Sequence, residues 1–199
     1  MTKTMAMVVG LIVCEMLPLG TALQSTAEAQ ARQFAISRAR VRFTSEAPLE
    51  TINGVSNTAT GSVNIDPANL SSVRGTITVP VRSLRTGIEL RDEHLRGADW
   101  LDAGSHPNAT FEITGVSGAS RLTANQDATL RVTGRFTIHG QTHNVTAEVR
   151  AKWDGQNGIR ARARFTIQLS QYGVSINPAV RLKVSNDIQV TMDIQATAS

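Results

Sequence analysis

Residues 159–167 read Ile-Arg-Ala-Arg-Ala-Arg-Phe-Thr-Ile, so apolar and polar side chains alternate along the whole segment. Successive side chains of a β-strand point to opposite faces, and such alternation is typical of a strand with one buried and one exposed face. Three further segments alternate as clearly, over residues 132–138, 145–153 and 188–194. Weaker strand patterns cover residues 34–43, 60–65, 74–81 and 109–116. The sequence therefore predicts an all-β chain of about eight antiparallel strands.

Turn signals lie between these segments, at Asp66-Pro67, at His139-Gly140 and over residues 154–158. Short hairpin connections between strands with one apolar face suit a closed antiparallel β-barrel, which has no exposed sheet edge. A β-sandwich has the same alternation and stays an alternative at this point. In the first strand the even-numbered positions are apolar up to Ile36 and are occupied by arginine from residue 38 on. This change near Ser37 predicts a β-bulge there.

Residues 83–101 break the strand pattern and predict one short helical insertion between strands. Thr86 and Glu89 have the spacing of a capping box, in which each side chain bonds a free amide at the start of a helix. We expect this helix to close or line one end of the barrel, with four apolar side chains turned inward: Leu90, Leu95, Trp100 and Leu101. The residues expected at the polar boundary of that end are Arg91, Asp92 and His94.

Two motifs stand out in the sequence. The first consists of Ser83-Leu84-x-Thr86-Gly87, Arg91-Asp92-x-His94-Leu95, His106-Pro107 and Phe111. The second is Gly134-x-Phe136-Thr137-Ile138-His139-Gly140-x-Thr142-x-x-Val145. These motifs, in this order, resemble the signature of the YceI-like family. The resemblance covers residues 34–199 and implies a secreted bacterial, lipocalin-like β-barrel that holds a polyisoprenoid chain. The family's late Arg-x-Asp-Phe-Gly-like segment is replaced here by Leu-Ser-Gln-Tyr-Gly at residues 169–173, which leaves the identity of the lipid open.

The first 29 residues have the pattern of an export signal. Lys3 precedes a short apolar run over residues 5–13, and Ala27-Glu28-Ala29 forms a cleavage site before Gln30. The run is too short to span a bilayer. The sequence thus predicts a signal peptide over residues 1–29, a single domain over residues 30–199, and a periplasmic or secreted protein. Lipid attachment at Cys14, the one cysteine of the chain, is the alternative.

Small side chains are frequent on the predicted inward face, and they leave room for an apolar cavity in a barrel of about eight strands. They also suit a barrel that tapers or packs its helix inside, so both interpretations stay open from the residues alone. The resemblance favours a cavity for a polyisoprenoid, a prenyl quinone or a similar long-chain lipid, held without covalent attachment for transport or storage. The candidate ligand-binding residues on the strands are Phe136, Ala147, Trp153, Ala161, Ala163 and Phe165. Those of the helical segment are Arg91, His94 and Trp100.

Motifs for catalysis and metal binding are absent from the sequence. It has no Gly-x-Ser-x-Gly elbow, no phosphate-binding glycine loop and no His-Glu-x-x-His helix. The four histidines lack the paired spacing of a zinc site. We therefore expect neither a metal site nor enzyme activity.

The chain carries a net charge of +4, and six of its arginines form two ladders, at Arg38, Arg40 and Arg42 and at Arg160, Arg162 and Arg164. No aromatic side chain lies among them to stack on bases, which argues against nucleic acid as a partner. Two interpretations remain open: an ordinary solvated face, or contact with an anionic surface of the bacterial envelope. The alternative to lipid binding is accordingly a non-enzymatic β-sandwich envelope protein that acts through its basic surface. The oligomeric state is left open.

Overall fold

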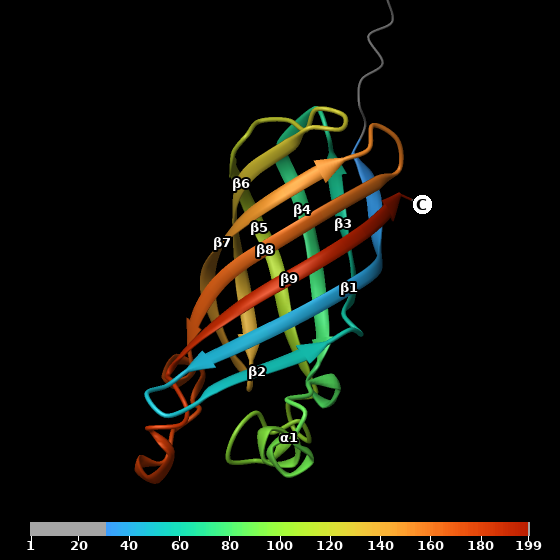
Figure 1. Ribbon diagram of the computed structural model, residues 1–199. Coiled ribbons are helices and arrows are strands. Elements are labelled where there is room, and N and C mark those ends of the chain that lie inside the picture. The colour runs from blue at the N-terminus through green and yellow to red at the C-terminus, as the bar shows by residue number, and fades with distance from the viewer. Residues whose placement is uncertain (1–30, 199) are drawn as a thin grey trace, which may run out of the picture.

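The computed structural model describes residues 31–198 and consists mainly of β-strands (Figure 1). In chain order these are β1 (Arg32–Glu46), β2 (Thr51–Ser56), β3 (Thr60–Asp66), β4 (Asn69–Pro80), β5 (Asn108–Gly118), β6 (Asp127–Ile138), β7 (Gln141–Trp153), β8 (Gly158–Gln168) and β9 (Asp187–Ala198). The predicted signal peptide over residues 1–29 and the alternative lipid attachment site at Cys14 lie outside the described residues.

The strands form one closed antiparallel barrel, because β1 pairs with β9 as well as with β2 and β3. β2 lies beside residues 41–46 of β1, whereas β3 lies beside residues 32–35. β2 and β3 therefore share one position, and the nine strands fill the eight positions of the barrel. Between these two contacts, residues 36–40 of β1 pair with β9 alone. Closure confirms the predicted lipocalin-like barrel and excludes the β-sandwich.

The alternating segments of the sequence correspond to strands with one buried face. On β8, Ile159, Phe165 and Ile167 are buried, whereas the intervening arginines are exposed. All the predicted strands are present, and β2 is an additional strand that the pattern did not reveal. β2 contains Asn53 and Gly54, which are residue types depleted in strands.

Two local backbone features also follow from the sequence. The register of β1 against β9 shifts between Ile36 and Arg38, which confirms the predicted bulge near Ser37. His139 (φ 51°) and Gly140 (φ 71°) both have positive φ between β6 and β7. Positive φ at both central residues is the requirement of a type I′ hairpin turn, so this turn lies where it was predicted.

The helices lie in two connections at one end of the barrel. The β4–β5 connection contains η1 (Val81–Ser83) and α1 (Glu89–Arg96), and the β8–β9 connection contains η2 (Leu169–Tyr172) and η3 (Pro178–Val180). Figure 1 shows α1, the β8–β9 connection and the β1–β2 turn together at the lower end. Within the described residues, no helix has the length and apolar character needed to cross a membrane.

Candidate functional site

An apolar cavity of about 430 Å³ lies inside the barrel at the end that carries α1. Its strand-borne walls are aliphatic and aromatic, and include Val79, Phe111, Phe136, Ile138, Val190 and Met192. The β4–β5 connection contributes Leu84, Ile88, Leu90, Leu95, Trp100 and Leu101. The charged or titratable side chains of the lining are Glu50, Arg91, His94 and Lys183. The cavity is thus lined almost entirely by hydrocarbon, with its charged or titratable groups confined to four side chains.

The β4–β5 connection lines this cavity as the sequence indicated. All four apolar residues expected to point inward contribute to the lining, and Leu101 is also fully buried, at 4% exposure. Leu90 lines the cavity from its rim, because 62% of its surface remains exposed. The helix itself is shorter than the predicted segment, since it begins at Glu89 and ends at Arg96.

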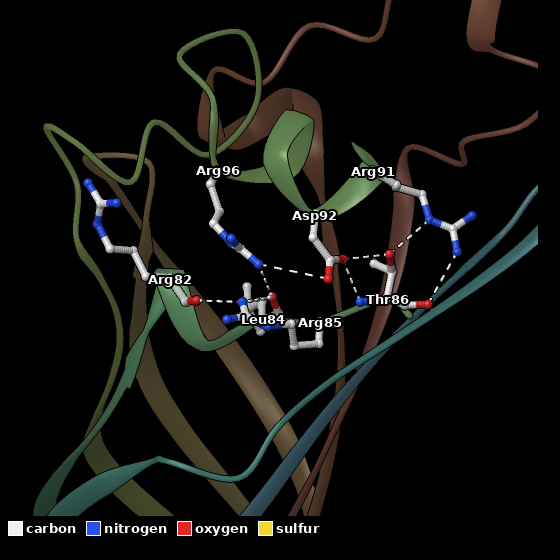
Figure 2. Close-up of polar contacts among 7 residues, drawn as sticks. All are labelled: Arg82, Leu84, Arg85, Thr86, Arg91, Asp92 and Arg96. Carbon is white, nitrogen blue, oxygen red and sulfur yellow. Dashed lines mark hydrogen bonds and ion pairs between the residues drawn. The ribbon is translucent and has the colours of Figure 1, made fainter. Parts of the chain in front are cut away.

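The start of α1 differs from the predicted capping box. The residue before the helix is Ile88, and no side chain bonds the first amides. The hydroxyl and the amide of Thr86 both donate instead to one carboxylate oxygen, Oδ1 of Asp92, at 2.6 Å each (Figure 2). Gly87, with a φ of 84°, lies between Thr86 and the helix, and its backbone conformation keeps Thr86 from leading directly into α1. The Thr86 hydroxyl therefore fixes the loop to the helix side chain rather than capping the helix.

Asp92 is a buried carboxylate held by these donors, with only 4% of its surface exposed. Burial on its own raises the pKa of Asp92, but the two bonds from Thr86 and the positive charges of Arg96 and Arg85 outweigh it. The pKa of Asp92 consequently lies below its usual value. A charged Asp92 is thus the form that holds the loop and the helix together.

Arg91 joins α1 to the β1–β2 turn. Its Nε donates to the Thr86 hydroxyl at 3.0 Å and its Nη2 to the Thr86 carbonyl at 3.3 Å (Figure 2). Its Nη1 lies 2.6 Å from Oε1 of Glu50. Each nitrogen of the guanidinium group therefore has a partner within the protein, which is the arrangement of a positioning residue.

The remaining candidates of the helical segment and Phe136 also border the cavity. His94 is exposed at the rim, and its side chain has no hydrogen bond or ion pair among the described residues. Trp100 is half-buried and contributes to the wall. Phe136 is buried, and its ring contacts those of Phe165 and Tyr172 edge-on, with centroids 5.3 and 5.7 Å away.

Five of the predicted ligand-binding residues lie outside the cavity lining: Ala147, Trp153, Ala161, Ala163 and Phe165. These small side chains therefore lie outside this cavity, and their contact with a ligand stays a prediction. Ala147 is 1% exposed within the packed core. At Gly134, an added Cβ would lie 2.6 Å from the ring of Phe111. The alternative interpretation, in which small residues accommodate packing, applies to this part of the barrel.

Most of the lining residues that were not predicted lie on strands, and others come from the β1–β2 turn and the β8–β9 connection. Glu50 follows β1, whereas Val180, Lys183 and Val184 belong to the β8–β9 connection. The sequence signal was the run Val-Arg-Leu-Lys-Val over residues 180–184, whose apolar and basic residues alternate outside any predicted strand. Its place at the cavity depends on the closure of the barrel.

Two of the four histidines, His139 and His143, bond to backbone carbonyls. Nδ1 of His139 lies 2.9 Å from the carbonyl of Tyr172, and Nε2 of His143 lies 2.8 Å from that of Gln171. A carbonyl only accepts, so each of these ring nitrogens carries a proton. In residues 31–198, no group of three or more histidine, cysteine or acidic side chains is placed to hold a metal ion.

Residues 27–196 match the model of the YceI-like domain. A UPF0312 protein of Pseudomonas paraeruginosa is 30% identical over 171 residues, which cover 81% of this chain and 86% of the relative. Among solved structures, Burkholderia cenocepacia BcnA superposes with a TM-score of 0.69 at 24% identity, over 80% of this chain and 96% of that one. A polyisoprenoid binding domain from Saccharophagus degradans has a TM-score of 0.67 at 15% identity, over 83% and 98%. The chain belongs to the YceI-like domain family.

Proposed function

We propose that this protein binds a long-chain apolar lipid in the cavity and acts as a carrier or storage protein of the bacterial envelope. The observation that carries the proposal is the cavity itself, whose walls are hydrocarbon on the strands and on the β4–β5 connection. Each methylene group moved from water into such walls contributes about 0.8 kcal/mol. The similarity to a polyisoprenoid binding domain of Saccharophagus degradans supports the same class of ligand.

The lipid that fits this proposal is a polyisoprenoid, a prenyl quinone or a similar chain, held without a covalent bond. The charged side chains of the lining suit a ligand with one polar end near the rim and its tail in the interior. The proposed role is binding and not catalysis, since no paired acid and base or activated nucleophile borders the cavity among the described residues. We propose a periplasmic or secreted location, on the basis of the export pattern in residues 1–29.

Native mass spectrometry of protein purified from its own envelope tests this function directly. The expected result is a non-covalent adduct that organic extraction releases as a long-chain lipid. Protein that carries no adduct and shows no thermal shift with prenyl quinones, prenyl alcohols or fatty acids would contradict the proposal.

A pair of alanine variants localises the binding. Ala109 is buried and lines the cavity, whereas Ala147 is buried in the packed core outside it. Ala109→Phe should occupy the cavity and weaken lipid binding by roughly tenfold or more while the barrel remains folded. Ala147→Phe should lower the free energy of unfolding by about 1–3 kcal/mol without a comparable loss of lipid affinity. Equal affinities of Ala109→Phe and the unmodified protein would place the ligand elsewhere.

A further inference from the structure

The described residues expose four large apolar side chains by more than half of their surface: Leu49 (68%), Ile88 (52%), Leu90 (62%) and Leu182 (57%). All four belong to the end of the barrel that holds the cavity. Ile88 and Leu90 line the cavity from α1 and the loop before it. The amide of Leu49 donates to the carbonyl of Leu182 at 2.8 Å, and this joins the β1–β2 turn to the β8–β9 connection. We call these four side chains the collar.

The part of the collar around Leu182 is basic. Arg181 and Lys183 flank Leu182, both are exposed, and neither side chain has a hydrogen bond or ion pair among the described residues. Residues 169–186 contain no acidic side chain. The exposed acids of this end are on other segments, for example Glu89 and Glu93 of α1. Apolar and basic side chains are thus exposed together beside the cavity, a combination that fits the surface of an anionic bilayer.

We propose that the collar docks this protein on a lipid bilayer that contains anionic headgroups, with the cavity facing the membrane. Leu49 and Leu182 enter the boundary between headgroups and acyl chains, and Arg181 and Lys183 contact the headgroup phosphates. This docking rests on the proposed function in one respect, because the lipid then passes between bilayer and cavity without crossing water. The association with the bilayer itself does not require an occupied cavity.

The arginine ladders are a weaker candidate for the same contact. They lie on the outward faces of β1 and β8, where Asp193 of β9 forms ion pairs with both Arg42 and Arg162. None of the exposed large apolar side chains of the described residues lies on that wall. The outward faces of β1 and β8 therefore offer charge without an apolar anchor, whereas the collar offers both.

Sedimentation with vesicles separates the two surfaces. The probe is phosphatidylcholine vesicles with and without phosphatidylglycerol, and the test variant is Leu49→Ser combined with Leu182→Ser, since neither leucine lines the cavity. This double variant should lower partitioning onto phosphatidylglycerol vesicles by roughly tenfold or more. The matched control combines Arg38→Gln with Arg160→Gln, on the outward faces of β1 and β8. This control should change partitioning by less than about twofold.

Lipid binding by the same variants distinguishes the docking from the proposed function. The leucine double variant should keep the lipid affinity and circular dichroism spectrum of the unmodified protein, and it should transfer lipid between vesicles more slowly. Unchanged partitioning of this variant would overturn the proposal, as would a loss confined to the arginine double variant. Concentration-dependent dimers that the leucine substitutions abolish, without vesicle binding by the unmodified protein, would identify a second copy as the partner and also overturn it. Vesicle binding by an Ala109→Phe protein that holds no lipid would uphold docking independently of the cavity.

Discussion

Asp92 accepts two hydrogen bonds from Thr86, one from the amide and one from the hydroxyl, both at 2.6 Å and both to Oδ1. The two residues belong to different segments, because Thr86 precedes α1 and Asp92 lies within it. This pair sets the position of the helix against the loop, and through Leu90 and Leu95 it sets one wall of the cavity.

The first prediction concerns the pH dependence of stability. Because the pKa of Asp92 is lowered by folding, its charge stabilises the protein above the usual pKa of a carboxyl group, and this contribution is lost as the pH falls through the lowered value. Asp92→Asn should therefore be less stable than the unmodified protein at neutral pH, and the difference should shrink below about pH 4. Urea denaturation over a pH series measures this. Asp99→Asn, at an exposed position, is the control, and a difference that does not depend on pH would contradict the assignment.

The Thr86 hydroxyl provides a second prediction. Thr86→Val keeps the shape of the side chain but removes the donor to Asp92 and the acceptor of Arg91 Nε. The free energy of unfolding should fall by about 1.5–3 kcal/mol, as expected for a hydrogen bond to a charged group. Thr86→Ser retains the hydroxyl and should lose less than about 0.5 kcal/mol. Equal losses in both variants would assign the effect to packing.

Gly134 supplies a third prediction, about packing in the barrel wall. A Cβ at this position would lie 2.6 Å from the carbonyl oxygen of Glu112 and 2.6 Å from the ring of Phe111. Gly134→Ala should therefore lower the free energy of unfolding by about 1–3 kcal/mol. At Gly104 the nearest atom, Oδ1 of Asp102, is 3.5 Å from such a Cβ, so Gly104→Ala is a control with little expected change. Thermal and urea unfolding of both variants would decide the matter.

Arg91 yields a fourth prediction, about ligand selectivity. Its guanidinium nitrogens bond to Thr86 and Glu50, so substitution should loosen the loop rather than remove a headgroup contact. Arg91→Met should reduce binding of a fatty acid and of a hydrocarbon of the same length by the same factor. Fluorescence displacement titrations can compare the two ligands. A selective loss of the fatty acid would show that Arg91 leaves its internal partners when a ligand binds.

The strands could be predicted because alternation is a local property, visible within a few residues such as 159–167. The bulge near Ser37 was visible for the same reason. The short strand β2 was missed because its Asn53 and Gly54 join the barrel through pairing with β1, which is a long-range contact. Closure between β1 and β9 is equally long-range, and here the family resemblance favoured the barrel over a sandwich.

The site was predicted in part. The β4–β5 connection stands out by its composition, so its contribution to the cavity could be inferred from the sequence. The capping box failed because Gly87 turns the chain between two residues whose spacing was correct. The alanines of β7 and β8 lie outside the cavity lining, because the curvature of the barrel, which local alternation does not reveal, decides which side chains border the open space. Leu182 and Lys183 belong to the alternating run over residues 180–184, but its place at the cavity end depends on where the β8–β9 connection folds back.

The split position shared by β2 and β3 has a consequence for the dynamics of the barrel wall. Residues 36–40 of β1 pair with β9 on one side and with neither β2 nor β3 on the other. In an antiparallel strand alternate amides point to opposite sides. Amide hydrogens in this stretch that point away from β9 should exchange with deuterium at rates typical of an edge strand, while those that point toward β9 are protected. The barrel is closed in topology, yet it would retain one seam at which its wall opens without rupture of the β1–β9 ladder.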